Sequence, residues 1–262
     1  MPKNSVAQLD FDPRRVALGS DELRGRVVAI TGPTAGIGRA LAIECARRGA
    51  EVVLIGRNVK KLEAVYDAIV ALRQNGATVA DPSIAPLDLE KAVAADYDAI
   101  AAAVMQQYGR LDGLVHNAAL LGYLSPIDDF DVPTWVKVMH VNVTAPFALT
   151  QVLLPALRAS SDASVVFMSS AVGRKGRAYW GAYGVSKFAL EGLMQTLADE
   201  LENTNVRVNS LNPGKARTQM RRQAYPSEAV ESLPLPESLV APIIALLGPQ
   251  SRGVRSGAFD AQ

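Results

Sequence analysis

The sequence predicts an α/β fold built on one doubly wound parallel sheet with helices on both faces. Two observations lead to this prediction. Short apolar runs rich in β-branched residues alternate with helical patterns along most of the chain. The first run, residues 27–30, is followed at once by a glycine-rich turn and a helical pattern, which is typical of the βα unit of a Rossmann-like domain. Such a sheet places its ligand crevice at the carboxyl ends of the strands.

Length and composition indicate a single domain. The 262 residues are 49% hydrophobic, which is enough to bury a full core. We expect this domain to span residues 25–262, after an N-terminal arm, residues 1–24, that lies on the surface. The arm contains no long apolar stretch, so neither a signal peptide nor a membrane span is expected.

Charge and cysteine content narrow the expected partners. The 27 basic and 26 acidic residues leave a net charge of +1, which gives no electrostatic basis for binding nucleic acid or an anionic membrane. Small molecules and other subunits are the expected partners. The one cysteine, Cys45, lies in the apolar pattern of the first helix and is expected to be buried, which fits a cytoplasmic location.

Residues 31–38 read Thr-Gly-Pro-Thr-Ala-Gly-Ile-Gly and connect the first strand to the first helix. Glycine tolerates positive φ and has no Cβ, so Gly32, Gly36 and Gly38 permit a tight turn in which a pyrophosphate reaches backbone N–H groups at the positive end of the helix. The spacing G-x-x-x-G-x-G differs from the common G-x-G-x-x-G, so the generic fingerprint does not strictly apply. The alternative is an ordinary βα turn without a ligand.

The remaining elements follow in alternation. Further strands are expected at residues 51–56, 83–87, 111–116, 164–168, 206–211 and 258–259. Helices after the first are expected at residues 59–74, 90–108, 134–159, 183–202 and 237–247. Asn75-Gly76 and Gly109 end two of these helices, and Pro86 makes the third strand the weakest.

Cofactor choice is expected to depend on the end of the second strand. An NAD-selective site typically places a carboxylate there for the ribose 2′-OH, whereas a 2′-phosphate calls for arginine. This chain has Gly56-Arg57, and the guanidinium of Arg57 can form charge-assisted bonds with a phosphate. The alternative is a surface arginine at a helix entry. The sequence therefore favours NADP(H).

Tyr183 and Lys187 are one helical turn apart and lie on the same face. A nearby ammonium favours phenolate, which lowers the pKa of a tyrosine from near 10 toward the range of a general acid or base. The pair alone is weak evidence, because this spacing is common on amphipathic helices. Ser169 and Ser170, after the strand at 164–168, add hydroxyl groups at the carboxyl edge of the sheet.

Together these motifs resemble those of the short-chain dehydrogenase/reductase family over about residues 25–218. The shared motifs are T-G-x-x-x-G-I-G at residues 31–38, Asn117-Ala118 after the fourth strand, Asn142, Ser170, Y-x-x-x-K at Tyr183 and Lys187, and P-G-x-x-x-T from Pro213 to Thr218. Their order and separations are also similar to the family's, which is much harder to obtain by chance than any one motif. The most similar branch is an uncharacterised bacterial one with H-N-A-[GA] after the fourth strand and F-D-A-Q near the C-terminus.

The resemblance implies roles for four catalytic residues. Tyr183 would donate a proton to a carbonyl or accept one from an alcohol, and Lys187 would hold the nicotinamide ribose and lower the pKa of Tyr183. Ser170 would position the substrate oxygen, and Asn142 would support a proton relay through water. The cofactor-binding residues implied by the family pattern are Gly32, Thr34, Ala35, Gly36, Ile37, Gly38, Arg57, Asn58, Asp88, Leu89, Asn117, Ala118, Tyr183, Lys187, Pro213, Gly214 and Thr218.

One position departs from the family pattern. The family usually has N-N-A-G where this chain has His116-Asn117-Ala118-Ala119. The methyl group of Ala119 is expected to narrow the floor of the cofactor pocket without preventing binding. His116, at the end of an apolar strand, is expected to be a hydrogen-bonded structural residue. With two histidines and one cysteine, no metal site is expected.

A break in the helix at 134–159 is expected at Asn142. Pro146 lies four residues later and has no N–H, so the carbonyl of Asn142 is left without its helical partner. In the family the corresponding carbonyl takes part in the proton relay. The alternative is a plain proline kink with solvent at the carbonyl.

We therefore expect an NADP(H)-dependent oxidoreductase that interconverts a carbonyl and an alcohol on a small-molecule substrate. The alternative is a catalytically weak NADP(H)-binding sensor or scaffold, but the complete set of Asn142, Ser170, Tyr183 and Lys187 favours the enzyme. The family commonly pairs subunits through the helices near 132–159 and 183–202, so a homodimer or homotetramer is expected. The apolar residues on more than one face of these helices are Val138, Phe147, Leu149, Phe188 and Met194.

Substrate specificity is expected in the loops, chiefly a substrate loop at about residues 213–237. Basic residues gather in two loop segments that we expect to border one crevice, Arg174, Lys175 and Arg177 in the first and Lys215, Arg217, Arg221 and Arg222 in the second. A positive crevice attracts anions, so an anionic substrate is one interpretation. The alternatives are contacts with the cofactor pyrophosphate, ion pairs with a neighbouring subunit, and solvated side chains.

Overall fold

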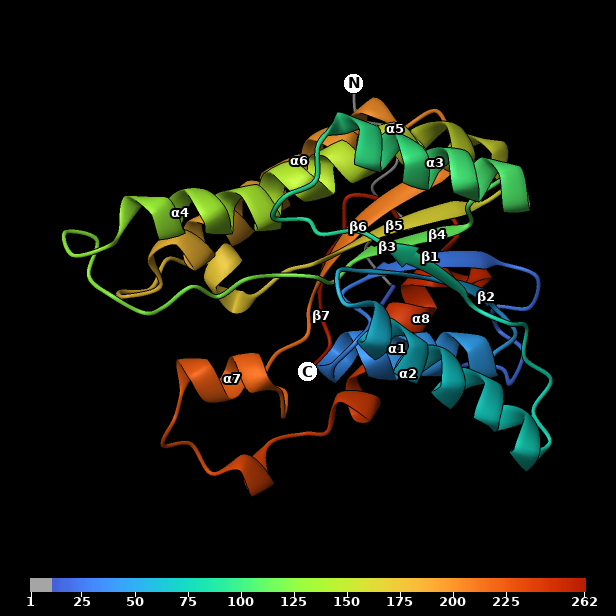
Figure 1. The fold of residues 1–262 in the computed structure, drawn as a ribbon, viewed down its shortest axis with the longest axis horizontal. Coiled ribbons are helices and arrows are strands. Elements are labelled where there is room, and N and C mark those ends of the chain that lie inside the picture. The colour runs from blue at the N-terminus through green and yellow to red at the C-terminus, as the bar shows by residue number, and fades with distance from the viewer. Residues whose placement is uncertain (1–10) are drawn as a thin grey trace.

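A seven-stranded parallel sheet runs through the centre of the molecule (Figure 1). The computed structural model describes residues 11–262. The strand order is β3-β2-β1-β4-β5-β6-β7, so the order reverses at β1 and β4. The strands are β1 (Val27–Thr31), β2 (Glu51–Gly56), β3 (Ser83–Pro86), β4 (Gly113–His116), β5 (Ala163–Met168), β6 (Val206–Asn212) and β7 (Ala258–Asp260). The expected doubly wound, Rossmann-like sheet is confirmed.

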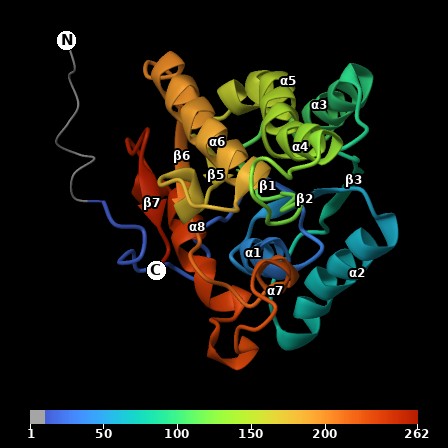
Figure 2. The same ribbon diagram turned by 90° about the vertical axis from the view of Figure 1, so that its left-hand side faces the viewer.

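Helices cover both faces of the sheet (Figures 1 and 2). They are α1 (Gly36–Arg47), α2 (Val59–Val70), α3 (Ala94–Tyr108), α4 (Val132–Met139), α5 (Ala145–Ala159), α6 (Gly181–Glu200), α7 (Gln219–Ala224) and α8 (Ala241–Leu247). One core lies between the sheet and α3, α5 and α6, and the other between the sheet and α1, α2 and α8. Every residue of β4 and β5 is buried, and most of these residues are apolar, because both faces of the sheet are covered. Cys45 is fully buried in the second core, as expected.

The N-terminal arm is only partly described, because residues 1–10 lie outside the described residues. Within residues 11–24, the ring of Phe11 packs edge-on against Phe259, with 5.7 Å between the ring centres. Leu23 is fully buried and belongs to the core beside α1. The end of the arm is therefore anchored to the domain through Phe11 and Leu23, while many of its other residues are exposed.

Three helical regions differ from expectation. The helix expected from residue 90 begins only at Ala94, because residues 91 and 92 form a turn on the carbonyl of Asp88 and Asp96 accepts a bond from the N–H of Val93. Helix α7 was not expected and is only six residues long, with the side chain of Thr218 accepting a bond from the N–H of Arg221 at its start. The helix expected at residues 237–247 divides into a 3₁₀ turn, Pro236–Leu239, and α8.

The helix expected at residues 134–159 is distorted around Asn142. A π-helical turn, His140–Thr144, separates α4 from α5. This is consistent with the missing N–H of Pro146, and π turns are frequent at functional sites. The chain stays helical through the distortion, so the expected break takes the form of a π turn.

Within residues 11–262, two apolar segments reach the length and composition of a membrane-spanning helix. They are Val132–Ala159 and Val230–Leu247, with mean hydropathies of 1.2 and 1.5. Of the apolar window in each segment, 44% and 56% respectively is buried inside the protein. Core helices pass the same criterion, so these values do not by themselves indicate a membrane span.

The apolar residues expected at a subunit interface divide into two groups. Val138, Leu149 and Met194 are fully buried in the protein's own interior. Phe147 on α5 and Phe188 on α6 are 49% and 45% exposed. Only the two phenylalanines of the expected set are therefore available to a second subunit.

Candidate active site

The glycine turn between β1 and α1 adopts a conformation that only glycine accommodates. Gly32 and Gly36 have φ values of +65° and +52°. A Cβ on Gly38 would lie 2.3 Å from the carbonyl oxygen of Gly32, and one on Gly32 would lie 3.0 Å from Cα of Ala118. No side chain caps the start of α1, because Ala35 occupies the N-cap position. The first N–H groups of α1 therefore remain available to an anion.

Asn117 holds this turn against the end of β4. Its side-chain amide donates to the carbonyl oxygens of Thr31 and Gly32, both at 3.1 Å. The Thr31 hydroxyl in turn accepts the N–H groups of Asn117 and Ala118 at 3.0 and 3.1 Å. These bonds join β1 and β4, the two strands at which the order of the sheet reverses.

A cleft of about 590 Å³ extends from the end of β2, past the glycine turn, to Tyr183 and Lys187 on α6. Most of the residues predicted to bind a cofactor line it, namely Gly32, Thr34, Ala35, Gly36, Ile37, Arg57, Asn58, Asp88, Leu89, Asn117, Ala118, Tyr183, Lys187, Pro213 and Thr218. Gly38 and Gly214 do not line the cleft. Gly38 lies beneath the turn, and Gly214 makes a positive-φ turn against Gln262, so both are required for the backbone path.

Other residues line the cleft that sequence reasoning missed, including Lys61, Glu90, Gln219, Met220 and Gln223. Lys61 lies four residues after Arg57, and a basic pair at this helical spacing is a signal that could have identified it. The others come from loops and from the short helix α7, whose position depends on tertiary packing.

Arg57 lines the cleft after β2, where the adenosine of a dinucleotide is expected to bind. It also forms an ion pair within the protein. Its guanidinium is 3.8 Å from Glu90, which also pairs with Lys137 at 2.7 Å. The Arg57 side chain is 64% exposed, so its long ion pair with Glu90 stabilises the protein little. The side chain of Asn58 accepts a bond from the N–H of Lys61 at 3.0 Å and caps α2. The role of Asn58 is thus at least partly structural.

Tyr183, Ser170 and Lys187 meet at the inner end of the cleft. A side-chain hydrogen bond joins Ser170 and Tyr183. The Lys187 ammonium donates to the carbonyl oxygen of Met168 at 2.7 Å and lies 5.5 Å from the centre of the Tyr183 ring. Both Tyr183 and Lys187 are buried. Neither Ser170 nor Asn142 lines the cleft itself.

The pKa of Tyr183 differs from the sequence expectation. Burial raises the pKa of Tyr183 to about 12, and only the bond with Ser170 opposes this shift. In this structure, burial outweighs the lowering of the pKa that was expected from Lys187. The physical reason is that burial disfavours the phenolate, while burial also lowers the pKa of Lys187 to about 8 and its ammonium is bonded to Met168. The Tyr183 hydroxyl is therefore protonated at neutral pH, and in this form it can donate a proton.

Glu191, one turn after Lys187, forms a buried network that supports these residues. Its carboxylate accepts bonds from Ser169 at 2.5 Å, from Ser210 at 2.7 Å and from Arg174 at 3.3 Å. Ser169 precedes Ser170 at the end of β5, and Ser210 belongs to β6. The network therefore connects α6 to two strands at the carboxyl edge of the sheet.

Asn142 connects the π turn to the same region. Its side chain accepts the N–H of Leu120 at 2.7 Å and donates to the carbonyl of Leu120 at 2.9 Å and to the hydroxyl of Ser186 at 3.0 Å. Ser186 immediately precedes Lys187 on α6. The side chain of Asn142 therefore fixes the loop after β4 against α6.

His116 is a structural residue, consistent with the sequence interpretation. It is buried, bonds the hydroxyl of Thr150 at 2.7 Å and stacks on Phe167 with 4.8 Å between ring centres. Burial lowers its pKa to about 3, so the ring is neutral. Among residues 11–262, no group of three or more His, Cys, Asp and Glu side chains is arranged to hold a metal ion.

These features agree with comparisons to known proteins. The family model for short chain dehydrogenases matches residues 26–229. The chain is 45% identical over 242 residues to an uncharacterized oxidoreductase of Escherichia coli (strain K12), YciK, covering 92% of this chain and 94% of that protein. The chain belongs to the short-chain dehydrogenase family.

Solved members of the family are similar along nearly the whole chain. A short chain dehydrogenase from Pseudomonas syringae has 50% identity and a TM-score of 0.91, covering 94% of this chain and 98% of that one. One from Escherichia coli CFT073, complexed with NADPH, has 45% identity and a TM-score of 0.89, covering 93% and 99% of the two chains.

Within this short-chain dehydrogenase, neutral side chains surround Tyr183 on its substrate side. Leu121, Val172 and Tyr183 form a small buried cluster. Residues packed against it are Ala119, Leu124, Trp180, Met220 and Ala224. Ala119, where the family usually has glycine, thus adds its methyl group to this apolar cluster. Gln219 and Gln223 line the cleft as neutral hydrogen-bonding groups.

The basic residues of the two loop segments do not line the cleft that contains Tyr183, which corrects the sequence expectation. Arg174 is paired with Glu191 and, at 3.0 Å, with Asp260. Arg177 donates to the hydroxyl of Tyr225 at 2.7 Å. The two segments therefore do meet, through Arg177 and Tyr225, but tertiary contacts direct their charges elsewhere.

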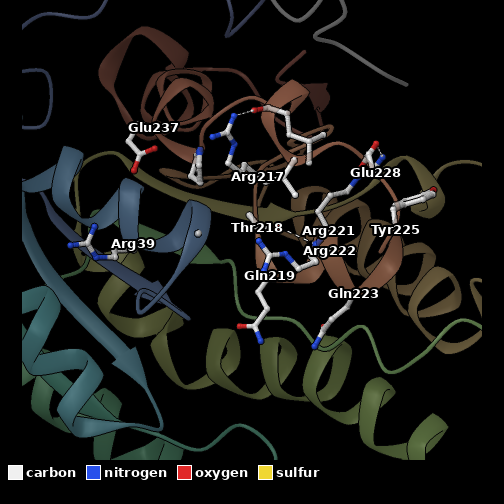
Figure 3. Close-up of a pocket in the computed structure, with 14 residues that line it drawn as sticks. Arg39, Arg217, Thr218, Gln219, Arg221, Arg222, Gln223, Tyr225, Glu228 and Glu237 are labelled. Atoms are coloured by element: carbon white, nitrogen blue, oxygen red, sulfur yellow. Dashed lines mark hydrogen bonds and ion pairs between the residues drawn. The ribbon is translucent and has the colours of Figure 1, made fainter.

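The arginines of the second segment lie around a different cavity. Figure 3 shows Arg217 and Arg221 on the side of α7 opposite to the amides of Gln219 and Gln223. Arg217, Arg221 and Arg222 all line that cavity. Gln219 and Gln223 line both this cavity and the cleft that contains Tyr183, whereas the three arginines line the cavity alone.

Proposed function

We propose that this short-chain dehydrogenase binds NADP(H) and interconverts a carbonyl and an alcohol, with Tyr183 as the general acid or base. The observation that carries the proposal is the buried Tyr183 hydroxyl, bonded to Ser170 and with Lys187 one turn away, in a cleft continuous with the glycine turn. A binding module does not need a buried, proton-donating tyrosine at this position.

The residues of the cleft fit a dinucleotide. The glycine cradle would be filled by any Cβ, and the uncapped N-terminus of α1 offers N–H groups to a pyrophosphate. Arg57 and Lys61 line the end of the cleft after β2 and would bind a 2′-phosphate. Lys187 and Asn117 lie where the other end of the cofactor would extend. When bound, the nicotinamide supplies or accepts the hydride.

Residues of this chain supply the proton that carbonyl reduction requires. In the reducing direction, the Tyr183 hydroxyl donates its proton to the carbonyl oxygen of the substrate. The hydroxyl of Ser170, bonded to Tyr183, orients the acceptor oxygen. The positive charge of Lys187, 5.5 Å from the ring centre, stabilises the phenolate that forms.

The apolar side chains packed against Tyr183 favour a substrate with an uncharged group next to the reacting carbonyl. The apolar cluster and the amides of Gln219 and Gln223 would hold this group. An anionic substrate receives no support from the residues that line this part of the cleft. Its charge would have to lie away from the reacting carbon.

The test is an activity screen with the full chain. NADPH oxidation would be followed with neutral aldehydes, ketones and quinones, with anionic carbonyl compounds of similar shape, and with 3-oxoacyl thioesters. We expect turnover with the neutral compounds, at rates that do not fall with added salt. Tight NADPH binding without turnover of any compound would favour the alternative, a cofactor-binding sensor or scaffold.

A further inference from the structure

The second cavity lies outside the cofactor cleft and has a volume of about 670 Å³. Helix α1 forms one wall, and the segment from Arg217 to Glu237 forms the rest (Figure 3). The cavity shares four residues with the cofactor cleft, Gly36, Thr218, Gln219 and Gln223. Its size is that of a pocket for a small molecule.

The charge of this cavity is unusual for a protein with a net charge of +1. Four arginines line it, Arg39, Arg217, Arg221 and Arg222, against the two acids Glu228 and Glu237. Arg221 and Glu228 neutralise each other through a bidentate pair with distances of 2.5 and 2.6 Å. The guanidinium of Arg221 also lies 3.8 Å from the centre of the Tyr225 ring. This pair is therefore part of the wall, and three arginines remain in the lining with one further acid, Glu237.

Arg217 is also partly used by the fold. It donates to the carbonyl oxygens of Glu231 at 2.9 Å and Leu233 at 3.3 Å, and so fixes the segment between α7 and α8. Carbonyl oxygens do not cancel its charge. Arg217 therefore contributes a fixed positive charge to the wall.

Arg39 and Arg222 are different. Among residues 11–262, neither guanidinium has a carboxylate within ion-pair distance or a hydrogen-bond partner. Most arginines of the described chain do form ion pairs, including Arg26, Arg174 and Arg207. Arg39, Arg217 and Arg222, which have no acid partner, therefore line the same cavity. An anion that enters the cavity would be attracted by these charges and could accept charge-assisted hydrogen bonds.

We propose that this cavity binds the phosphate or carboxylate group of a small anionic molecule, with Arg39 and Arg222 as the side chains that bind it. Arg217 supplies further positive charge. The site is separate from the cofactor cleft, because neither Arg39 nor Arg222 lines that cleft. The proposal does not depend on the proposed reaction, since it concerns binding alone.

Two sources of the anion are distinguishable. The group belongs either to a separate small molecule or to the far end of a substrate whose neutral carbonyl reaches Tyr183. The shared wall residues Gln219 and Gln223 make the second source geometrically direct, because they line both spaces. In both cases the group that binds is an oxyanion, and the same two arginines bind it.

The test is a calorimetric titration of inorganic pyrophosphate into the full chain at low ionic strength, with and without saturating NADP⁺. We expect binding in both conditions. Arg39→Gln and Arg222→Gln should each weaken binding by roughly tenfold, since each removes charge-assisted hydrogen bonds. The matched control is Arg158→Gln, at an exposed arginine near the end of α5 that does not line the cavity. The control should bind pyrophosphate as the unchanged protein does.

Three results would overturn the proposal. They are the absence of binding, binding that Arg39→Gln and Arg222→Gln leave unchanged, and binding that disappears when NADP⁺ saturates the protein. The last would assign the anion to the cofactor cleft. If the chain binds no NADP⁺, the proposed function fails, and the variants still test the cavity in the protein alone. Inhibition by pyrophosphate that competes with the carbonyl substrate would indicate the far end of a substrate as the source, and non-competitive inhibition would indicate a separate molecule.

Discussion

Lys187 and Glu191 lie one turn apart on α6, both almost fully buried and of opposite charge. Burial lowers the pKa of Lys187 to about 8, and the negative charge of Glu191 opposes this shift. The other groups against Lys187 are the ring of Tyr183 and the carbonyl oxygen of Met168. Glu191 therefore acts on the site through Lys187, as a positioning residue, and does not touch the reacting atoms.

Glu191→Gln should shift the pH profile of carbonyl reduction. Removing the negative charge lowers the pKa of Lys187 further, so the ammonium loses its proton at a lower pH. We expect kcat/KM of the unchanged protein to decline as pH rises through about 8, the pKa of Lys187, and this decline to move to lower pH in the variant. Ser210→Ala is the control, because it removes one hydrogen bond to Glu191 but keeps the charge. An equal shift in both variants would indicate a purely structural role.

Tyr183→Phe should remove proton transfer while leaving the cleft nearly intact. General acid catalysis contributes about 10²- to 10⁴-fold, so kcat/KM should fall by that range. The affinity for NADPH, measured by fluorescence titration, should change by less than about threefold because the ring is retained. Activity within a factor of two of the unchanged protein would exclude Tyr183 as the proton donor.

Arg57→Ala tests the choice of cofactor. The unchanged protein should bind NADPH much more tightly than NADH, and the variant should lose most of this preference through weaker NADPH binding. A lost charge-assisted bond to phosphate corresponds to roughly a tenfold to hundredfold change in Kd. Lys61→Ala should give a smaller loss, since Lys61 lies one turn further along α2. Equal affinities for the two cofactors in the unchanged protein would contradict the prediction.

His116 should make the protein sensitive to acid. Burial lowers the pKa of His116 in the folded state to about 3, below its usual 6.5. As pH falls below 6.5, the unfolded chain takes up a proton that the folded protein does not, so the free energy of unfolding falls by up to about 1.4 kcal/mol per pH unit. This stabilisation is fully present above pH 6.5. It is lost progressively as pH falls toward 3.

His116→Gln should remove this dependence. Urea unfolding at pH 7 and pH 5 would show a smaller difference in free energy of unfolding for the variant than for the unchanged protein. His140→Gln, at the other histidine of the chain, is the matched control. The prediction fails if both variants keep the full difference between the two pH values.

Phe147 and Phe188 should contribute to self-association. Their exposed rings lie on α5 and α6, the helices through which this family commonly pairs. Phe188→Glu places a charge on this surface and should reduce the dimer fraction measured by light scattering at micromolar concentration. Val59→Glu, at an exposed apolar residue on α2, is the control. A mass of 27.8 kDa for the unchanged protein at that concentration would contradict the prediction of an oligomer.

Local patterns in the sequence determined the sheet, the glycine turn and the pair Tyr183 and Lys187 on α6. Buried parallel strands are rich in apolar residues, and the positive φ values of Gly32 and Gly36 favour glycine. Tyr183 and Lys187 were identifiable because a helix places residues four apart on one face. These features depend on interactions between neighbours in the chain, so they are visible without the fold.

Tertiary structure alone decided the pKa of Tyr183, the position of α7 and the direction of the basic side chains. The pKa depends on burial by residues distant in sequence, which outweighs the nearby ammonium. Helix α7 is too short to give a periodic pattern. Arg174 pairs with Asp260, and Arg177 with Tyr225, across dozens of residues. A cluster of charges in the sequence therefore indicates where positive charge exists, but only long-range packing determines which cavity it faces.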